Sequence, residues 1–345
     1  MNTVSRNAAI IAWIVCALII LPVRPAAAAF SPLVVPASAL SHIQAIGVTG
    51  GALPVYVATS SGLYRSASPT LSSWTRRSPI TDVVSISPNP RQPDNVIYAT
   101  SAAIYRSVNG GRSGVKVRSF DMGNSIGSLL FRSAMRPSIN YAMDDYHMYR
   151  STNDGATWAT TYTFMPSYDT YVRLTAGAID PANPMRFIVG YVGPHYDGAL
   201  DEINGARVSG DYDAPRPCPM LYTSPSTMAI NPIDASDIWI FCVPPPIDSG
   251  VGQLVEGGEG IVAGLHQDGN GFTPVVHAIV FDPVTGRPYI DAAGHIYAFI
   301  RATGAFVPFR TTARIQRVAA ITRSGYILAI DKQERLVVAR LVGRR

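Results

Sequence analysis

The sequence predicts an all-β fold, a β-propeller of seven four-stranded blades, and three observations support this. The chain has 27 prolines, 29 glycines and many short apolar runs that lack helical spacing. A short apolar strand that ends in a polar residue next to proline recurs along the chain, with starts 40 to 51 residues apart, which is the period of one blade. A third strand repeats almost literally in the first three blades.

The N-terminal segment, residues 1–29, is predicted to be a secretory signal peptide. Arg6 precedes an apolar run over residues 8–23, and Ala27 and Ala29 occupy the two positions that a signal peptidase reads. We therefore expect a mature chain that begins at Phe30 and is secreted or held in the cell envelope. An uncleaved membrane anchor is the alternative, although the apolar run is shorter than the roughly 20 residues of a usual span.

The charge balance of the mature chain does not favour a nucleic-acid partner. Without Arg6 and Arg24, the 28 basic residues become 26, against 23 acidic residues, and so small an excess gives little attraction for phosphates. We expect a monomer with no membrane span after the signal peptide. Residues 30–345 are predicted to form a single propeller domain.

The repeat itself defines the blades. In four places an apolar residue at the first strand of a blade is followed by a polar residue and a proline: Ile86-Ser87-Pro88, Ile179-Asp180-Pro181, Ile230-Asn231-Pro232 and Phe281-Asp282-Pro283. Weaker copies of this pattern occur near Ile46, Phe131 and Ile321. The third strand reads Leu63-Tyr64-Arg65-Ser66, Ile104-Tyr105-Arg106-Ser107 and Met148-Tyr149-Arg150-Ser151. The last blade lacks a fourth strand before the chain ends, and Leu33 to Val35 is predicted to supply it and close the ring. Six or eight blades are the alternatives to seven.

A tight turn follows the third copy of this strand, where the chain reads Ser-Thr-Asn-Asp-Gly-Ala-Thr-Trp over residues 151–158. The segment resembles the Asp-box, or BNR repeat, of the sialidase-like propellers, with asparagine where that family usually has aspartate. A decayed copy spans residues 107–113. The resemblance implies a structural role on the face away from the ligand, in which side chains cap the turn, glycine takes a positive φ and tryptophan anchors the turn between sheets. The structural residues of the box are Ser151, Asn153, Gly155, Thr157 and Trp158.

The resemblance leaves the activity open, because sialidases, other glycoside hydrolases, sorting receptors and photosystem assembly factors share this architecture. The Phe-Arg-Ile-Pro segment of the sialidases is missing, and the most similar segment, residues 131–134, lies in the third blade. No pair of carboxylates stands out, and no His or Cys spacing suits zinc. The sequence therefore predicts a non-catalytic binding or scaffolding module for a carbohydrate or an extracellular protein, with a glycoside hydrolase of sialidase-like fold as the alternative.

Loop lengths place the predicted site on the top face over blades three to five. The second-to-third-strand loops of blades four and five are read as long, over residues 193–204 and 244–259, and long loops on a rigid scaffold often carry function. Carboxylates beside tyrosines suit a sugar or calcium, and no other cofactor is expected. The alternative is a solvated, variable loop surface. The candidate ligand-binding residues are Asp144, Asp145, Tyr146, His147, Tyr168, Tyr171, Arg173, His195, Tyr196, Asp201, Glu202 and Glu256.

The two cysteines of the mature chain are predicted to be free. Cys218 is assigned to the start of the fourth strand of blade four, near the bottom face, and Cys242 to the end of the second strand of blade five, near the top. A disulfide needs Cα atoms within about 7 Å of each other.

Overall fold

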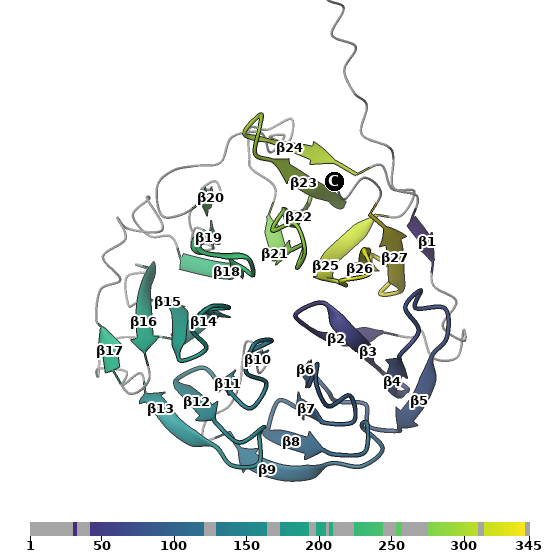
Figure 1. Ribbon diagram of the computed structural model, residues 1–345, viewed down its shortest axis with the longest axis vertical. Helices are drawn as coiled ribbons and strands as arrows, with labels where there is room; N and C mark the ends of the chain where they lie inside the picture. Colours follow the sequence, from purple (N-terminus) through teal and green to yellow (C-terminus); the bar gives the residue numbers. More distant parts are fainter. Residues whose placement is uncertain are drawn as a thin grey trace, which may run out of the picture.

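The chain folds into a β-propeller, as predicted. A computed structural model describes residues 30–32, 42–120, 129–163, 173–192, 198–204, 207–209, 224–243, 253–256, 275–309 and 314–341. Within these ranges every regular element is a β-strand, and the strands form seven antiparallel sheets that surround a central axis (Figure 1). No helix long and apolar enough to cross a membrane occurs in this part of the chain.

Each sheet is one blade, and successive strands run from its inner to its outer edge. Six sheets have four strands, and the described strands of blade five number three. In chain order the strands are β2 (Ile43–Thr49), β3 (Ala52–Thr59), β4 (Gly62–Ser66) and β5 (Thr75–Ser78) in blade one; β6 (Ser85–Pro88), β7 (Val96–Ala99), β8 (Ala103–Ser107) and β9 (Val115–Ser119) in blade two; β10 (Leu129–Arg132), β11 (Asn140–Met143), β12 (His147–Ser151) and β13 (Ala159–Thr163) in blade three; β14 (Arg173–Ile179), β15 (Arg186–Val192), β16 (Gly198–Asn204) and β17 (Arg207–Ser209) in blade four; β18 (Ser224–Asn231), β19 (Asp234–Val243) and β20 (Gln253–Glu256) in blade five; β21 (Val276–Phe281), β22 (Pro288–Ala292), β23 (His295–Ile300) and β24 (Ala305–Pro308) in blade six; and β25 (Ile315–Ile321), β26 (Tyr326–Asp331) and β27 (Leu336–Arg340) in blade seven.

The ring is closed by the N-terminal segment. Strand β1 (Phe30–Pro32) pairs antiparallel with β27, so that Phe30 lies opposite Ala339 and Pro32 opposite Val337. Blade seven thus receives its outer strand from the other end of the chain, which covers an edge that would otherwise be open to pairing. The strand lies at residues 30–32, and residues 33–35, named from the sequence, are outside the described residues.

Seven hydrophobic clusters hold the ring together, one between each pair of neighbouring blades. They arise because successive side chains of a strand point to opposite faces of its sheet. In β19, Trp239 and Phe241 pack against blade six, whereas Ile240 and Cys242 pack against blade four. The middle strands of each blade are therefore apolar on both faces.

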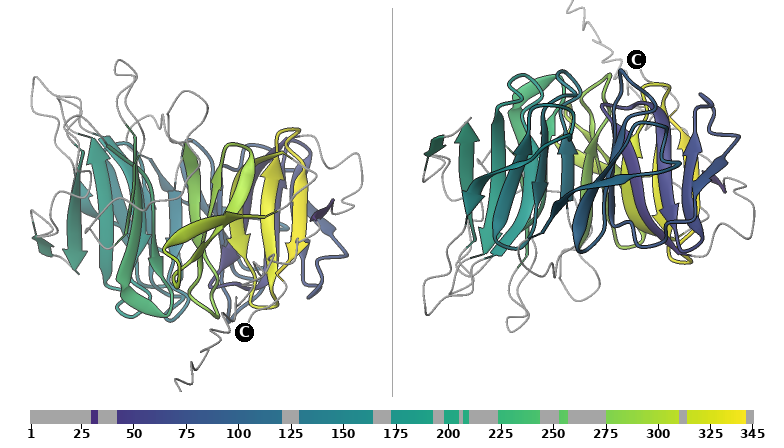
Figure 2. Two further views of the ribbon diagram at one scale, coloured as in Figure 1. Left: turned by 90° about the horizontal axis from the view of Figure 1, so that it is seen from above. Right: turned by 90° about the horizontal axis from the view of Figure 1, so that it is seen from below.

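The two faces of the ring, seen edge-on in Figure 2, carry different turns. The bottom face carries the turns between the first and second strands and between the third and fourth strands. On it, Asp180 Oδ1 accepts hydrogen bonds from the backbone N–H groups of Ala182 (2.7 Å) and Asn183 (2.9 Å), and Asp282 caps its turn in the same way. This explains why a polar residue beside proline recurs in the sequence.

The turns at residues 107–113 and 151–158 have the same geometry. Gly155 N donates to Ser151 Oγ (2.9 Å), and Thr157 N donates to Asn153 Oδ1 (2.9 Å). Trp158 Nε1 donates to Gly155 O (3.1 Å), and its ring is buried between blades two and three. The equivalent backbone bonds to Ser107 Oγ and Asn109 Oδ1 are 3.0 Å each.

Cys242 is buried in β19 and disulfide-bonded, so the prediction that it is free is wrong. The error lies in the strand assignment, because the fourth strand of blade four is β17 at Arg207–Ser209. Position 218 follows that strand and falls in the connection to blade five. Cys218 and Cys16 are the other cysteines of the chain, and both lie outside the described residues.

Candidate functional site

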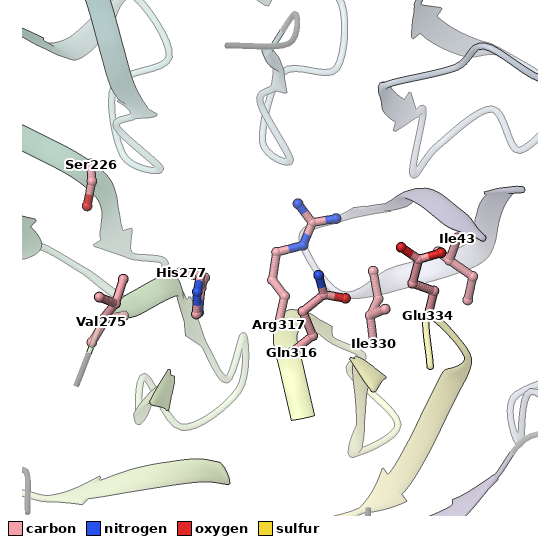
Figure 3. A pocket seen from close by; sticks show the side chains of 9 residues that line it. Ile43, Ser226, Val275, His277, Gln316, Arg317, Ile330 and Glu334 are labelled. Atoms are coloured by element: carbon pink, nitrogen blue, oxygen red, sulfur yellow. The ribbon is translucent and has the colours of Figure 1, made fainter. Parts of the chain in front are cut away.

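A pocket of about 460 Å³ lies on the top face, at the inner edges of blades five to seven, and we call this place the channel mouth (Figure 3). The top face carries the turns between second and third strands, and each inner strand starts there. The pocket is bounded by the top ends of β2, β18, β21, β25 and β26 and by the turn after β26. Its lining residues are Ile43, Ser226, Val275, Val276, His277, Gln316, Arg317, Ile330 and Glu334.

Five inner strands share one irregularity near their top ends. In β18, Pro225 pairs with Cys242 and Thr227 with Phe241, which leaves Ser226 as an extra residue. The pairing of β2, β14, β21 and β25 shifts at the corresponding place. Such β-bulges re-aim side chains and are common beside functional sites. The residues at these bulges are Gln44, Thr175, Ser226, His277 with Ala278, and Gln316.

Asp291 fixes the bulge of blade six. Its carboxylate is buried, and Oδ1 accepts hydrogen bonds from the backbone N–H groups of His277 (3.0 Å) and Ala278 (2.8 Å). Oδ2 accepts a hydrogen bond from Val318 N of blade seven (3.2 Å) and lies 3.6 Å from His277 Nδ1. One carboxylate therefore holds the His277 backbone, its imidazole and the neighbouring blade in place.

The pocket carries ionisable groups of both signs. Hydrogen bonding to Asp291 and the charge of that carboxylate raise the pKa of His277, while burial and Arg317 act in the opposite direction. The imidazole is therefore protonated at a higher pH than an ordinary histidine. Arg317 is exposed on β25. Glu334 is the exposed carboxylate among the lining residues, and it forms an ion pair with His42 Nδ1.

Asp144, a predicted ligand residue, is fully buried and caps its own turn. Oδ1 accepts hydrogen bonds from Tyr146 N (2.9 Å) and His147 N (2.7 Å), and Oδ2 accepts one from Tyr149 Oη (2.6 Å). Asp145 is also buried, whereas the other two members of this turn are half-buried. The equivalent position in other blades is occupied by Thr59, Thr100 and Asp331, whose side chains also form hydrogen bonds within their turns.

The other predicted residues are spread over two blades. Arg173 is the first residue of β14, Asp201 and Glu202 lie within β16, and Glu256 ends β20. The last three are thus in strands, which corrects the loop bounds 193–204 and 244–259. Their role in binding stays a prediction, and Tyr168, Tyr171, His195 and Tyr196 lie outside the described residues.

Sequence reasoning missed the pocket. Its polar residues are single positions at the starts of inner strands, and only the strand pairing reveals that they are bulged. For metals, no group of three or more His, Cys, Asp or Glu side chains in the described ranges is arranged to hold an ion. The suggestion of calcium stays untested.

Comparison with known proteins supports the fold and leaves the activity open. No family model matches the chain, and no curated protein sequence matches it. Among solved structures, an ancestral GH74 enzyme matches 86% of this chain at 13% identity and a TM-score of 0.53, and this chain spans 47% of its length. A structure of YCF48 bound to D1 peptide matches this chain at 9% identity and a TM-score of 0.58. The match covers 91% of this chain and 96% of the YCF48 chain. At these identities the likeness shows a shared β-propeller fold.

Proposed function

We propose that this chain is an exported β-propeller that binds a ligand on its top face without catalysing a reaction. The observation that carries the proposal is the lining of the channel-mouth pocket. It combines His277 and Arg317 with hydroxyl and amide groups. Its exposed carboxylate, Glu334, is already paired with His42. Glycoside hydrolysis needs two carboxyl groups that flank the scissile bond, and the described lining does not present such a pair.

The ligand class that we favour is a polypeptide, and the turns at residues 107–113 and 151–158 would be Asp-boxes on the opposite face. One structural neighbour is bound to a peptide, and this supports the choice of a protein partner. The other neighbour is a GH74 enzyme, so a carbohydrate ligand and a glycoside hydrolase remain the second candidates. The predicted residues of blades three to five would extend the binding surface outward from the pocket.

Two exposed valines of blade six provide a matched test. Val275 lines the pocket and is 52% exposed, whereas Val284 is 54% exposed in a bottom-face turn. We expect Val275→Trp to lower the affinity for any ligand found on a peptide or glycan array by at least about tenfold, since the indole would fill the pocket. Val284→Trp should bind like the unaltered protein. The reverse pattern would place the ligand on the bottom face and contradict the proposal.

The same arrays separate binding from catalysis. Spots should retain the protein, and no sugar should be released into solution over hours. Release of a sugar by the purified protein would favour the glycoside hydrolase. Loss of that release in Val275→Trp would then assign the reaction to the channel mouth.

Export is expected to remove residues 1–29. Mass spectrometry of the exported protein should find Phe30, or a close neighbour, at its N-terminus, because Ala27 and Ala29 suit signal peptidase. Phe30 would then begin the mature chain and also β1. Recovery of residues 1–29 on the protein in a membrane fraction would instead show an anchor.

A further inference from the structure

We propose that the bulged residues at the channel mouth form a receptor for the C-terminal carboxylate of a polypeptide, held between His277 and Arg317. This inference rests on the proposed function and names the chemistry of the ligand. It follows from the strand pairing, the cavity and the charges that line it. Figure 3 shows these side chains around the pocket.

The bulges place polar side chains of separate blades around one opening. Ser226, His277 and Gln316 come from three successive inner strands, and all three line the cavity. Each lies at a bulge, which takes its side chain out of the regular alternation of the strand. Ser226 Oγ donates a hydrogen bond to Phe241 O (3.1 Å), and His277 Nδ1 lies 3.6 Å from Asp291 Oδ2. The ring continues at Gln44 and Thr175, where Gln44 Oε1 and Thr175 Oγ1 are buried and have no hydrogen-bond partner among the described residues.

Two donors of positive charge point to an anion. His277 and Arg317 lie on adjacent inner strands of blades six and seven, and both line the pocket. The carboxylate of Asp291 accepts hydrogen bonds from three backbone N–H groups and lies 3.6 Å from His277 Nδ1, and Glu334 is paired with His42. A carboxylate between imidazolium and guanidinium would receive charge-assisted hydrogen bonds from both.

The remaining lining favours a chain terminus over an acidic sugar. Ile43, Val275, Val276 and Ile330 supply aliphatic walls, and the described lining contains no phenylalanine, tyrosine or tryptophan. Sugars are commonly held by stacking on aromatic rings, whereas an aliphatic wall suits the side chain next to a terminal carboxylate. The side chains of Gln316 and Ser226 can form hydrogen bonds with the last peptide groups of the ligand.

Protonation of His277 makes this binding depend on pH. The charged and titratable groups around its imidazole are Asp291 of β22, Arg317 of β25 and, across the pocket, Glu334 and His42. Asp291 raises the pKa of His277. A bound carboxylate would raise it further, because binding and protonation are linked. Binding should therefore be strongest below the raised pKa of His277 and weaken as the pH rises through it.

The test is an NMR titration of the histidine Cε1–Hε1 signals of the full mature protein. The probes are N-acetylvaline, its amide and glucuronate, and the His277→Gln variant identifies the His277 signal. N-acetylvaline should shift that signal and raise its pKa, and the amide should do neither. His277→Gln and Arg317→Met should each weaken binding of N-acetylvaline about tenfold or more. Two exposed residues outside the pocket lining give the controls, His295→Gln and Arg340→Met, which should bind normally.

Three results would overturn the inference: an unchanged His277 signal with N-acetylvaline, unchanged affinity in both pocket variants, or binding of glucuronate but not of N-acetylvaline. Failure of the proposed function is distinguishable from these. An array ligand that Val275→Trp blocks but N-acetylvaline does not displace would keep the proposed function and remove this inference. Binding of N-acetylvaline that tracks His277 and Arg317 would support the inference even if the arrays yielded no ligand.

Discussion

Replacement of Asp154 by asparagine is expected to lower the free energy of unfolding by about 3–5 kcal/mol, because it leaves the buried charge of Arg132 without a counter-ion. The side chain of Arg132 is 0% exposed, and its Nη1 is paired with Asp154 Oδ1. Burial lowers the pKa of Arg132 and Asp154 opposes that effect. Arg132 Nε and Nη2 have no hydrogen-bond partner in the described part of the chain. The carboxylate of Asp154 is thus the group that compensates the charge.

Asp154 also ties blade three to blade two. Its side chain accepts hydrogen bonds from Asn89 Nδ2 (3.1 Å) and Asn95 Nδ2 (2.6 Å), and its backbone oxygen accepts one from Arg106 Nε (2.9 Å). Asparagine is the suitable replacement because residue 154 has a φ of 58°, which asparagine tolerates better than alanine. Loss of the charge is therefore separated from strain in the turn.

Chemical denaturation measures this effect. The double variant with Arg132→Met and Asp154→Asn should be more stable than Asp154→Asn alone, since it removes the uncompensated charge. Asp94→Asn, at a largely exposed side chain, is the control and should change stability by less than about 1 kcal/mol. A loss below about 1 kcal/mol in Asp154→Asn would mean that the ion pair does not support the ring.

Replacement of Asp144 by alanine is expected to lower the free energy of unfolding by about 2–4 kcal/mol. Alanine removes the acceptor of two backbone N–H groups and of the buried Tyr149 hydroxyl, and bonds to a charged acceptor are worth about 1.5–3 kcal/mol each before solvent replaces some of them. Asp144→Asn keeps an oxygen for the turn and should lose less. Asp82→Ala, at an exposed residue, should be nearly neutral. An unchanged melting temperature with loss of ligand binding would instead support Asp144 as a binding residue.

The fold could be read from the sequence because its determinants are local. Blades two, four, five and six repeat an apolar strand, a polar residue such as Asp180 or Asp282, and a proline, and these patterns can be recognised in a single sequence. Blade closure follows from counting strands, although the outer strand lies three residues before the segment chosen from the sequence. The state of Cys242 was misjudged because β17 ends earlier than the sequence indicated.

The candidate site could not be read in the same way. A carboxylate in a turn looks like a ligand in sequence, but Asp144 holds the place that Thr59 and Thr100 hold in other blades, and its environment is a turn cap. The bulges at Ser226 and Gln316 are properties of pairing between strands, which no single strand encodes. Candidate site residues that depend on strand register therefore appear only with the structure.

Hydrogen exchange of the protein with an array-selected ligand tests the top-face site most directly. The account predicts slower exchange on binding at residues 275–279 and 314–318, where the inner strands of blades six and seven begin at the pocket. Exchange in the bottom-face turns at residues 282–287 and 322–326 should not change. Protection confined to those bottom-face turns, with none at the channel mouth, would contradict the account.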